Sequence, residues 1–119
     1  MNVNDPDKPG AAQRLEPDFR LVVSASAAGV LVVPHGELDL ATAPQLDAAL
    51  RMQKGPVAVD LRRLSFVDAS GLRVLLEAEA RSRQDGMNLR FIAGPAVRRL
   101  FELAAVPDPL PYVDPDAAR

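Results

Sequence analysis

Residues 64–72 read Leu64-Ser65-Phe66-Val67-Asp68-Ala69-Ser70-Gly71-Leu72 and mark a change between two kinds of predicted structure. Residues 57–61 alternate between inward apolar and other positions, which predicts a strand, and residues 62–67 are expected to form a loop. From residue 72 onward leucines recur at helical spacing, which predicts a helix that ends near residue 84, before Asp85-Gly86. This step from strand to helix is typical of an α/β domain.

The same patterns extend on both sides of this stretch. Residues 19–23 and 30–33 predict two strands of a hairpin, and Pro34 is expected to end the second strand or to place it at a sheet edge. Residues 42–53 predict a helix that opens with a capping box between Thr42 and Gln45. Residues 89–92 predict a further strand, and residues 94–104 a third helix. The order β-β-α-β-α-β-α predicts a mixed β-sheet covered by helices.

The length of 119 residues suits one domain, and the prolines mark its limits. Seven of the eleven prolines lie outside residues 18–106. Residues 1–17 are polar and without periodicity, so we expect a disordered N-terminal tail. The domain is expected over residues 18–113, followed by a short C-terminal tail over residues 114–119.

Composition excludes several function classes. The formal net charge of −2 predicts no attraction to nucleic acid or to anionic membranes. The absence of cysteine excludes disulfides, thiolate metal sites and a cysteine nucleophile. The N-terminus lacks the apolar core of a signal peptide, so a cytoplasmic protein without cofactor or metal is expected.

Ser70 is the residue that attracts a functional interpretation. Asp68 is a favourable N-cap for the helix that follows, which places Ser70 in the first turn, near the surface. Gly71 is expected to leave that surface bare, so that another protein could approach the hydroxyl. Considered alone, a serine at this position more often assists the helix cap than serves a function.

Three motifs together resemble the STAS domain family, which includes anti-sigma-factor antagonists. They are Gly36-Glu37-Leu38-Asp39, then Val59-Asp60-Leu61, then Asp68-Ala69-Ser70-Gly71-Leu72. The likeness spans residues 19–113 and implies a mixed sheet with its helices packed mainly on one face. It also implies that a partner kinase phosphorylates Ser70, the residue before the motif glycine.

The resemblance further implies a partner-binding surface around Ser70. Its expected members are Glu37, Asp39, Asp68, Ala69, Gly71, Leu72 and Arg73. Asp39 could instead serve its own turn before Thr42, and Asp68 could be a cap alone. Ala69 stands where serine is frequent in the family, and Arg73 where a small residue is common. The final helix of the family is expected to be short or absent here.

The implied function is that of an anti-sigma-factor antagonist in a partner-switching system for transcription or stress response. Its unphosphorylated form would bind an anti-sigma-factor serine kinase and free the sigma factor, and a serine phosphatase would reset phosphorylated Ser70. The alternative is a non-catalytic STAS subunit of a lipid-transport complex or of a stress-signalling scaffold. An enzyme is not expected, because the lone His35 has no positional claim on Ser70 and the chain has no Gly-x-Ser-x-Gly motif.

Overall fold

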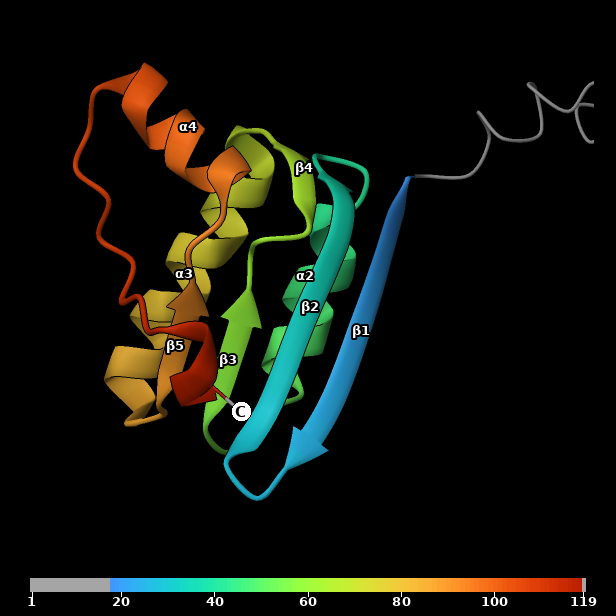
Figure 1. Cartoon of the computed structure of the whole chain (residues 1–119), viewed down its shortest axis with the longest axis vertical. Helices are drawn as coiled ribbons and strands as arrows, with labels where there is room; N and C mark the ends of the chain where they lie inside the picture. The colour runs from blue at the N-terminus through green and yellow to red at the C-terminus, as the bar shows by residue number, and fades with distance from the viewer. Residues whose placement is uncertain (1–17, 119) are drawn as a thin grey trace, which may run out of the picture.

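The computed structural model describes residues 18–118, so the tail expected over residues 1–17 lies outside the described residues. Its elements are β1 (Phe19–Ser26), β2 (Gly29–Leu38), α2 (Ala43–Arg51), β3 (Val57–Asp60), β4 (Leu64–Val67), α3 (Ala69–Asp85), β5 (Leu89–Ile92), α4 (Pro95–Ala104) and the 3-10 helix η1 (Pro115–Ala118) (Figure 1). The predicted strands and helices are present, with β4 as an addition.

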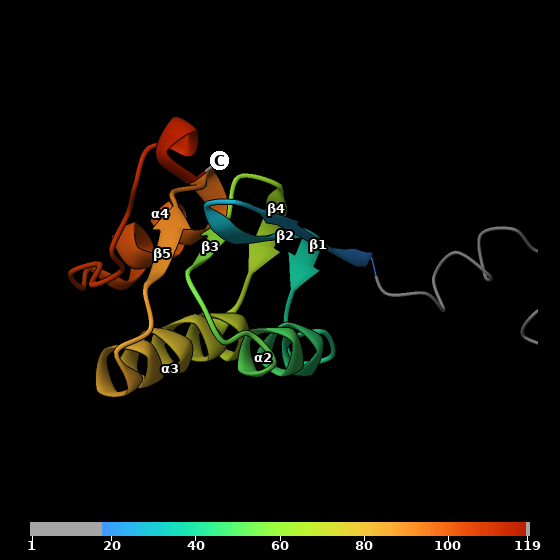
Figure 2. The same ribbon diagram turned by 90° about the horizontal axis from the view of Figure 1, so that it is seen from below.

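The strands form one mixed sheet in the order β1-β2-β3-β5, with β4 also pairing to β2. The hairpin of β1 and β2 is antiparallel, whereas β2 is parallel to both β3 and β4, and β3 is parallel to β5. α2 and α3 lie side by side on one face, and η1 lies on the other (Figure 2). The expected α/β fold is therefore confirmed.

The core lies between the sheet and the helices and is mainly aliphatic. Leu75, from the predicted inward stripe of α3, is fully buried, and Leu72 and Leu76 pack partly buried against the same cluster. A smaller cluster of Ala58 and Ile92 lies apart from this core. Burial of this apolar surface is the main favourable term for folding.

Pro34 does not end the second strand or place it at an edge, as the sequence had led us to expect. β2 continues to Leu38 and has partners on both sides. The N–H groups of Val30 and Gly36 point toward β3 and β4, where they donate to Pro56 and Arg63. Because backbone groups alternate along a strand, the Pro34 nitrogen also points to the side of β2 where β3 and β4 lie. Pro34 is opposite the gap between the end of β3 and the start of β4. A missing donor is harmless at that position.

Residues 64–67 form strand β4, whereas the sequence predicted a loop. This strand pairs with Gly36, Glu37 and Leu38, so most of the Gly36–Asp39 motif is also strand. The register shifts between Gly36 and Glu37, and Gly36 has a φ of 96°, which favours glycine. Four residues with only Leu64 and Val67 buried do not alternate, so periodicity gave no signal for β4.

The C-terminal segment covers the outer edge of β5. The Phe91 N–H donates to the Pro111 carbonyl at 2.9 Å, and the Val113 N–H donates to the Phe91 carbonyl at 2.8 Å. Between this segment and residue 118 the chain forms only the short helix η1, in line with the expectation of a short final element. One edge of the sheet is thus protected by the chain itself.

Candidate functional site

The site lies where β2 and β4 end side by side and α3 begins. Glu37 is the strand partner of Phe66, and Leu38 is the partner of Val67. The Asp68 N–H donates to the Leu38 carbonyl at 3.1 Å, which ties the start of α3 to the end of β2. The two motifs that are far apart in the sequence are therefore neighbours in the fold.

Asp68 is the N-cap of α3, as predicted. Its Oδ1 accepts a hydrogen bond from the Gly71 N–H at 3.0 Å, and its carbonyl accepts the Leu72 N–H at 2.9 Å. Its extended backbone, with φ −107° and ψ −174°, is typical of this position. The carboxylate also complements the positive end of the helix dipole.

Ser70 follows in the first turn of α3 and is half-buried. Within residues 18–118, its hydroxyl makes no hydrogen bond to another protein group, because Asp68 serves the cap. Ser70 faces an open groove between the starts of α2 and α3. The groove is lined by Leu40, Ala43, Pro44, Asp47, Ser70, Arg73, Val74 and Glu77. Among the described residues, the hydroxyl therefore supports no other part of the fold.

Gly71 does not leave a bare surface beside the hydroxyl, so the reason given for it from sequence is wrong. The residue is buried, and a Cβ atom there would lie 2.6 Å from Leu38 Cγ and 2.7 Å from the Leu38 carbonyl oxygen. Such distances are far inside van der Waals contact. The absence of a side chain at Gly71 therefore allows the first turn of α3, which carries Ser70, to pack closely against Leu38 of β2.

Asp39 organises the turn that connects β2 to α2. Its Oδ1 accepts hydrogen bonds from the N–H groups of Ala41 at 3.0 Å and Thr42 at 3.1 Å. These bonds show the turn role that the sequence left open for Asp39. All of its side-chain bonds among the described residues use Oδ1, so Oδ2 is available to a partner.

The predicted capping box between Thr42 and Gln45 is absent. Thr42 is the N-cap of α2, but its side chain makes no cap bond. Instead its Oγ1 donates to the Glu37 carbonyl at 2.7 Å and accepts the Asp39 N–H at 2.9 Å. The Thr42 hydroxyl thus satisfies two backbone groups at the end of β2, the Glu37 carbonyl and the Asp39 N–H, instead of capping α2.

The structure places the other predicted binding residues at different depths. Glu37, Ala69 and Arg73 are exposed, whereas Asp39, Asp68 and Leu72 are half-buried. Sequence reasoning missed two apolar side chains near them: Leu40 is 75% exposed and Phe66 is 49% exposed. A leucine in a polar turn was the available signal for the first. Exposed apolar side chains beside a polar site are common at protein interfaces.

The charges around the groove are partly paired. Asp47 of α2 forms ion pairs with Arg51 at 3.0 Å and with Arg81 of α3 at 3.8 Å, which joins the two helices. Arg73 forms no ion pair within the described part of the chain. Its guanidinium is therefore the unpaired cation nearest in sequence to Ser70.

Asp60, at the end of β3, belongs to a separate ion pair. Its carboxylate accepts hydrogen bonds from Arg62 Nε at 3.0 Å and Nη2 at 2.8 Å. Burial alone would raise the pKa of Asp60, but the hydrogen bonds and charge of Arg62, with the charge of Arg63, lower that pKa below its ordinary value. Arg62 thus holds the carboxylate of Asp60 in place at the end of β3.

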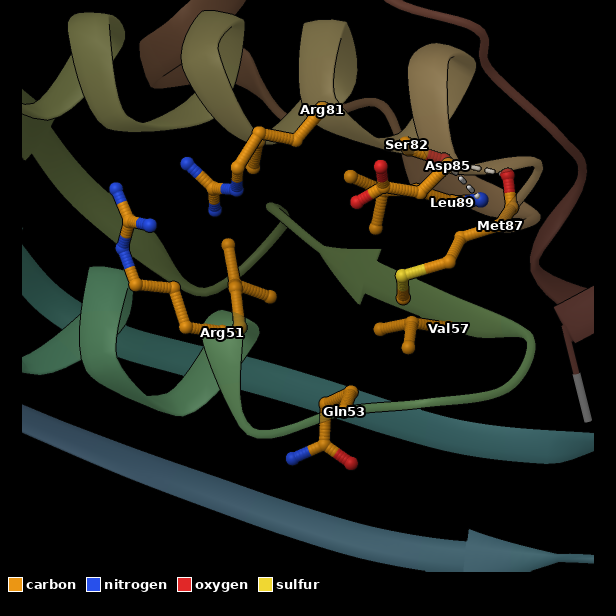
Figure 3. A pocket seen from close by; sticks show the side chains of 10 residues that line it. Arg51, Gln53, Val57, Arg81, Ser82, Asp85, Met87 and Leu89 are labelled. Carbon is orange, nitrogen blue, oxygen red and sulfur yellow. Dashed lines mark hydrogen bonds between the residues drawn. The ribbon is translucent and has the colours of Figure 1, made fainter.

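A second cavity lies between α2, the C-terminal half of α3 and the sheet, away from Ser70 (Figure 3). Its volume is about 220 Å³, smaller than the ~300–1,000 Å³ typical of small-molecule sites. Ser82 on its wall donates to the Met87 carbonyl and accepts the Leu89 N–H, so it closes the α3–β5 turn. We assign no ligand to this cavity.

Two properties of the described residues bear on other kinds of function. These residues contain no group of three acidic or histidine side chains arranged to hold a metal ion. None of their helices has the length and apolar character that crossing a membrane requires.

The chain is similar in fold to proteins of known structure and matches one family model. A family model described as "Mlab, STAS domain" matches residues 18–111. A crystal structure of an anti-sigma factor antagonist from Mycobacterium paratuberculosis is 25% identical, with a TM-score of 0.67, over 86% of this chain and 93% of that one. The anti-sigma factor antagonist SpoIIAA in its unphosphorylated form is 20% identical, with a TM-score of 0.59, over 81% and 87%. SpoIIAA of Bacillus in its phosphorylated form is also 20% identical, with a TM-score of 0.60, over 84% and 95%.

Proposed function

The chain belongs to the STAS domain family, and on that premise we propose that it is an anti-sigma-factor antagonist switched by phosphorylation of Ser70. The unphosphorylated form binds an anti-sigma-factor serine kinase in the cytoplasm and releases the sigma factor. Phosphorylation ends this binding, and a serine phosphatase restores it. The observation that carries the proposal is the Ser70 hydroxyl at the start of α3, which has no hydrogen-bond partner among residues 18–118 because Asp68 provides the cap.

The binding surface that we propose combines the end of β2 with the start of α3. Glu37, Asp39 and Asp68 supply negative charge, and Arg73 supplies positive charge. Leu40 and Phe66 add exposed apolar area that a partner could cover. An apolar centre with charged residues around it suits a reversible protein interface.

The chemistry of the switch follows from the position of Ser70. A phosphate adds about −1.5 to −2 charge at pH 7. The positive end of the α3 dipole tolerates that charge, so the fold is retained. A partner that had covered a neutral hydroxyl would have to desolvate the phosphate beside Asp68, which weakens the complex.

The STAS fold of anti-sigma-factor antagonists is generally non-catalytic, and we propose no enzymatic activity for this chain. His35 pairs with Arg20 in the β1–β2 hairpin. By alternation with the buried Pro34, it points to the face of the sheet opposite α2 and α3. It therefore has no route to act as a base for Ser70.

Co-purification from native cells tests the proposal. With the Ser70→Ala variant as bait, we expect an anti-sigma-factor kinase among the bound proteins, because this variant keeps the neutral binding surface. Mass spectrometry of the wild-type chain should find phosphate on Ser70. Recovery of lipid-transport or stress-scaffold components without a kinase would instead support the alternative, a non-catalytic STAS subunit of such a complex.

Asp39→Asn separates the charge of Asp39 from its turn role. Asparagine can keep the Oδ1 bonds to Ala41 and Thr42, so the unfolding midpoint should remain unchanged. Kinase affinity should fall about tenfold, about 1.4 kcal/mol, because a charge-assisted contact is lost. Titrations at low and high salt should show the loss shrinking as salt rises. Unchanged affinity at low salt would leave Asp39 with the turn role alone.

A further inference from the structure

The two edges of the sheet differ in how far the rest of the described chain covers them. Residues 111–113 hydrogen-bond along the outer edge of β5 and cover part of it. β1, at the opposite edge, pairs only with β2 among the described residues (Figures 1 and 2). An open strand edge is a template for pairing with another chain.

The hydrogen-bond pattern identifies the backbone groups on this open edge. The Glu37 N–H donates to the Asp18 carbonyl, and the β1–β2 register continues from that pair as Phe19 opposite Gly36. Because bonded and non-bonded pairs alternate, the even-numbered residues of β1 bond to β2. Pro34, which has no N–H, lies opposite Leu21 and so fits a non-bonded position. The outward backbone groups are those of Phe19, Leu21, Val23 and Ala25.

The side chains of β1 suit pairing. Val22 and Val23 are 40% and 48% exposed, one on each face of the sheet. Arg20 is the only charged residue in β1, and the strand contains no lysine or proline. Lysine and proline are the residues that most often keep an edge strand from pairing with another chain.

We propose that β1 pairs antiparallel with β1 of a second copy of this chain, about a two-fold axis at Val22. In this register Leu21 lies opposite Val23 of the partner subunit, and Phe19 lies opposite Ala25 of the partner subunit. Every outward N–H and carbonyl of the four residues then finds a bonding partner.

Other registers fit less well. After a shift by one residue, the outward N–H and carbonyl groups of one copy lie opposite residues whose groups point toward β2, so they cannot bond. A shift by two leaves Phe19 or Ala25 without a strand partner. The chosen register also sets Arg20 opposite Ser24 of the partner subunit, so the two arginines do not face each other. A self-complementary patch of this kind is what a two-fold dimer requires.

Cysteine cross-linking tests this register in the full chain, which contains no native cysteine. In Val22→Cys the two thiols would face each other at a non-bonded pair, with Cα atoms about 4.5 Å apart, within disulfide range. In the control Val23→Cys, on the other face, they would be offset by two residues, beyond the roughly 7 Å limit. Mild oxidation should therefore yield a reducible dimer for Val22→Cys and leave Val23→Cys monomeric on a non-reducing gel.

Light scattering on the wild-type chain completes the test. The mass should be twice the monomer mass of 12.8 kDa. Val23→Pro should return it to the monomer mass while keeping the circular dichroism spectrum, because the Val23 N–H points away from β2. A wild-type chain of monomer mass, or equal cross-linking of the two cysteine variants, would overturn the proposal.

Discussion

Replacing Gly71 with alanine should lower the free energy of unfolding by about 3 kcal/mol. The added Cβ would lie 2.6 Å from Leu38 Cγ and 2.7 Å from the Leu38 carbonyl oxygen. A side chain can rotate away, but this carbonyl is held at the end of β2 and accepts the Asp68 N–H. α3 would therefore have to move from the sheet, which disturbs its cap and its buried face. Overpacking typically costs about 1–3 kcal/mol, and a backbone contact argues for the upper end.

Chemical denaturation measures this change, with Gly55→Ala as the matched control. A Cβ atom added at Gly55 would have no neighbouring atom within 4 Å, and this glycine has no positive φ, so the same substitution there should leave stability nearly unchanged. The comparison also separates two explanations of the glycine at position 71. If Gly71→Ala keeps wild-type stability but blocks phosphorylation, the glycine serves the approach of the kinase, as the sequence suggested.

The fold was predictable because its main elements are long or strongly patterned. The leucine spacing of α3 and the alternation in β3 each identify an element without knowledge of the others. The family resemblance then supplied the sheet and the position of the helices. Asp68 was also predictable, because an N-cap depends on residues close in sequence.

The errors came from interactions between distant segments. Pro34 is tolerated inside β2 because two different strands share that side of it, which no local pattern reveals. Thr42 is the local exception: its hydroxyl bonds to the Glu37 carbonyl, five residues earlier, instead of capping α2. Gly71 was interpreted as an exposed residue because its neighbour Leu38 lies far away in sequence.

The site itself was only partly accessible from sequence. Family likeness selected Ser70, but only the structure shows that its hydroxyl is unengaged among residues 18–118 and faces a groove shared with α2. The exposure of Leu40 and Phe66 depends on how the turn after β2 and strand β4 are packed. Such exposure is a property of the tertiary structure, so periodicity in the sequence cannot give it.

Ser70→Asp should weaken binding to the kinase by about 3 kcal/mol, roughly 150-fold, while Ser70→Asn stays within a few-fold of wild type. The two substituents have nearly the same size, so their difference reports charge alone. Calorimetric titration of the kinase recovered with the Ser70→Ala bait gives both affinities. The Ser70→Asp variant should remain folded, because a carboxylate in the first turn of α3 is favoured by the helix dipole.

Labelling with ATP tests whether Ser70 is the phosphate acceptor. The wild-type chain should accept phosphate from the kinase, and Ser70→Ala should bind the kinase without being labelled. If label persists on Ser70→Ala, Ser65 becomes the candidate, since it is exposed on β4. Thr42 is a poor second choice, because it is 2% exposed and its hydroxyl is bonded to the Glu37 carbonyl.

Equal affinities for Ser70→Asp and Ser70→Asn would show that charge at this position does not release the partner. The switch would then have to act through the size of the phosphate beside the groove that Ser70 lines between α2 and α3.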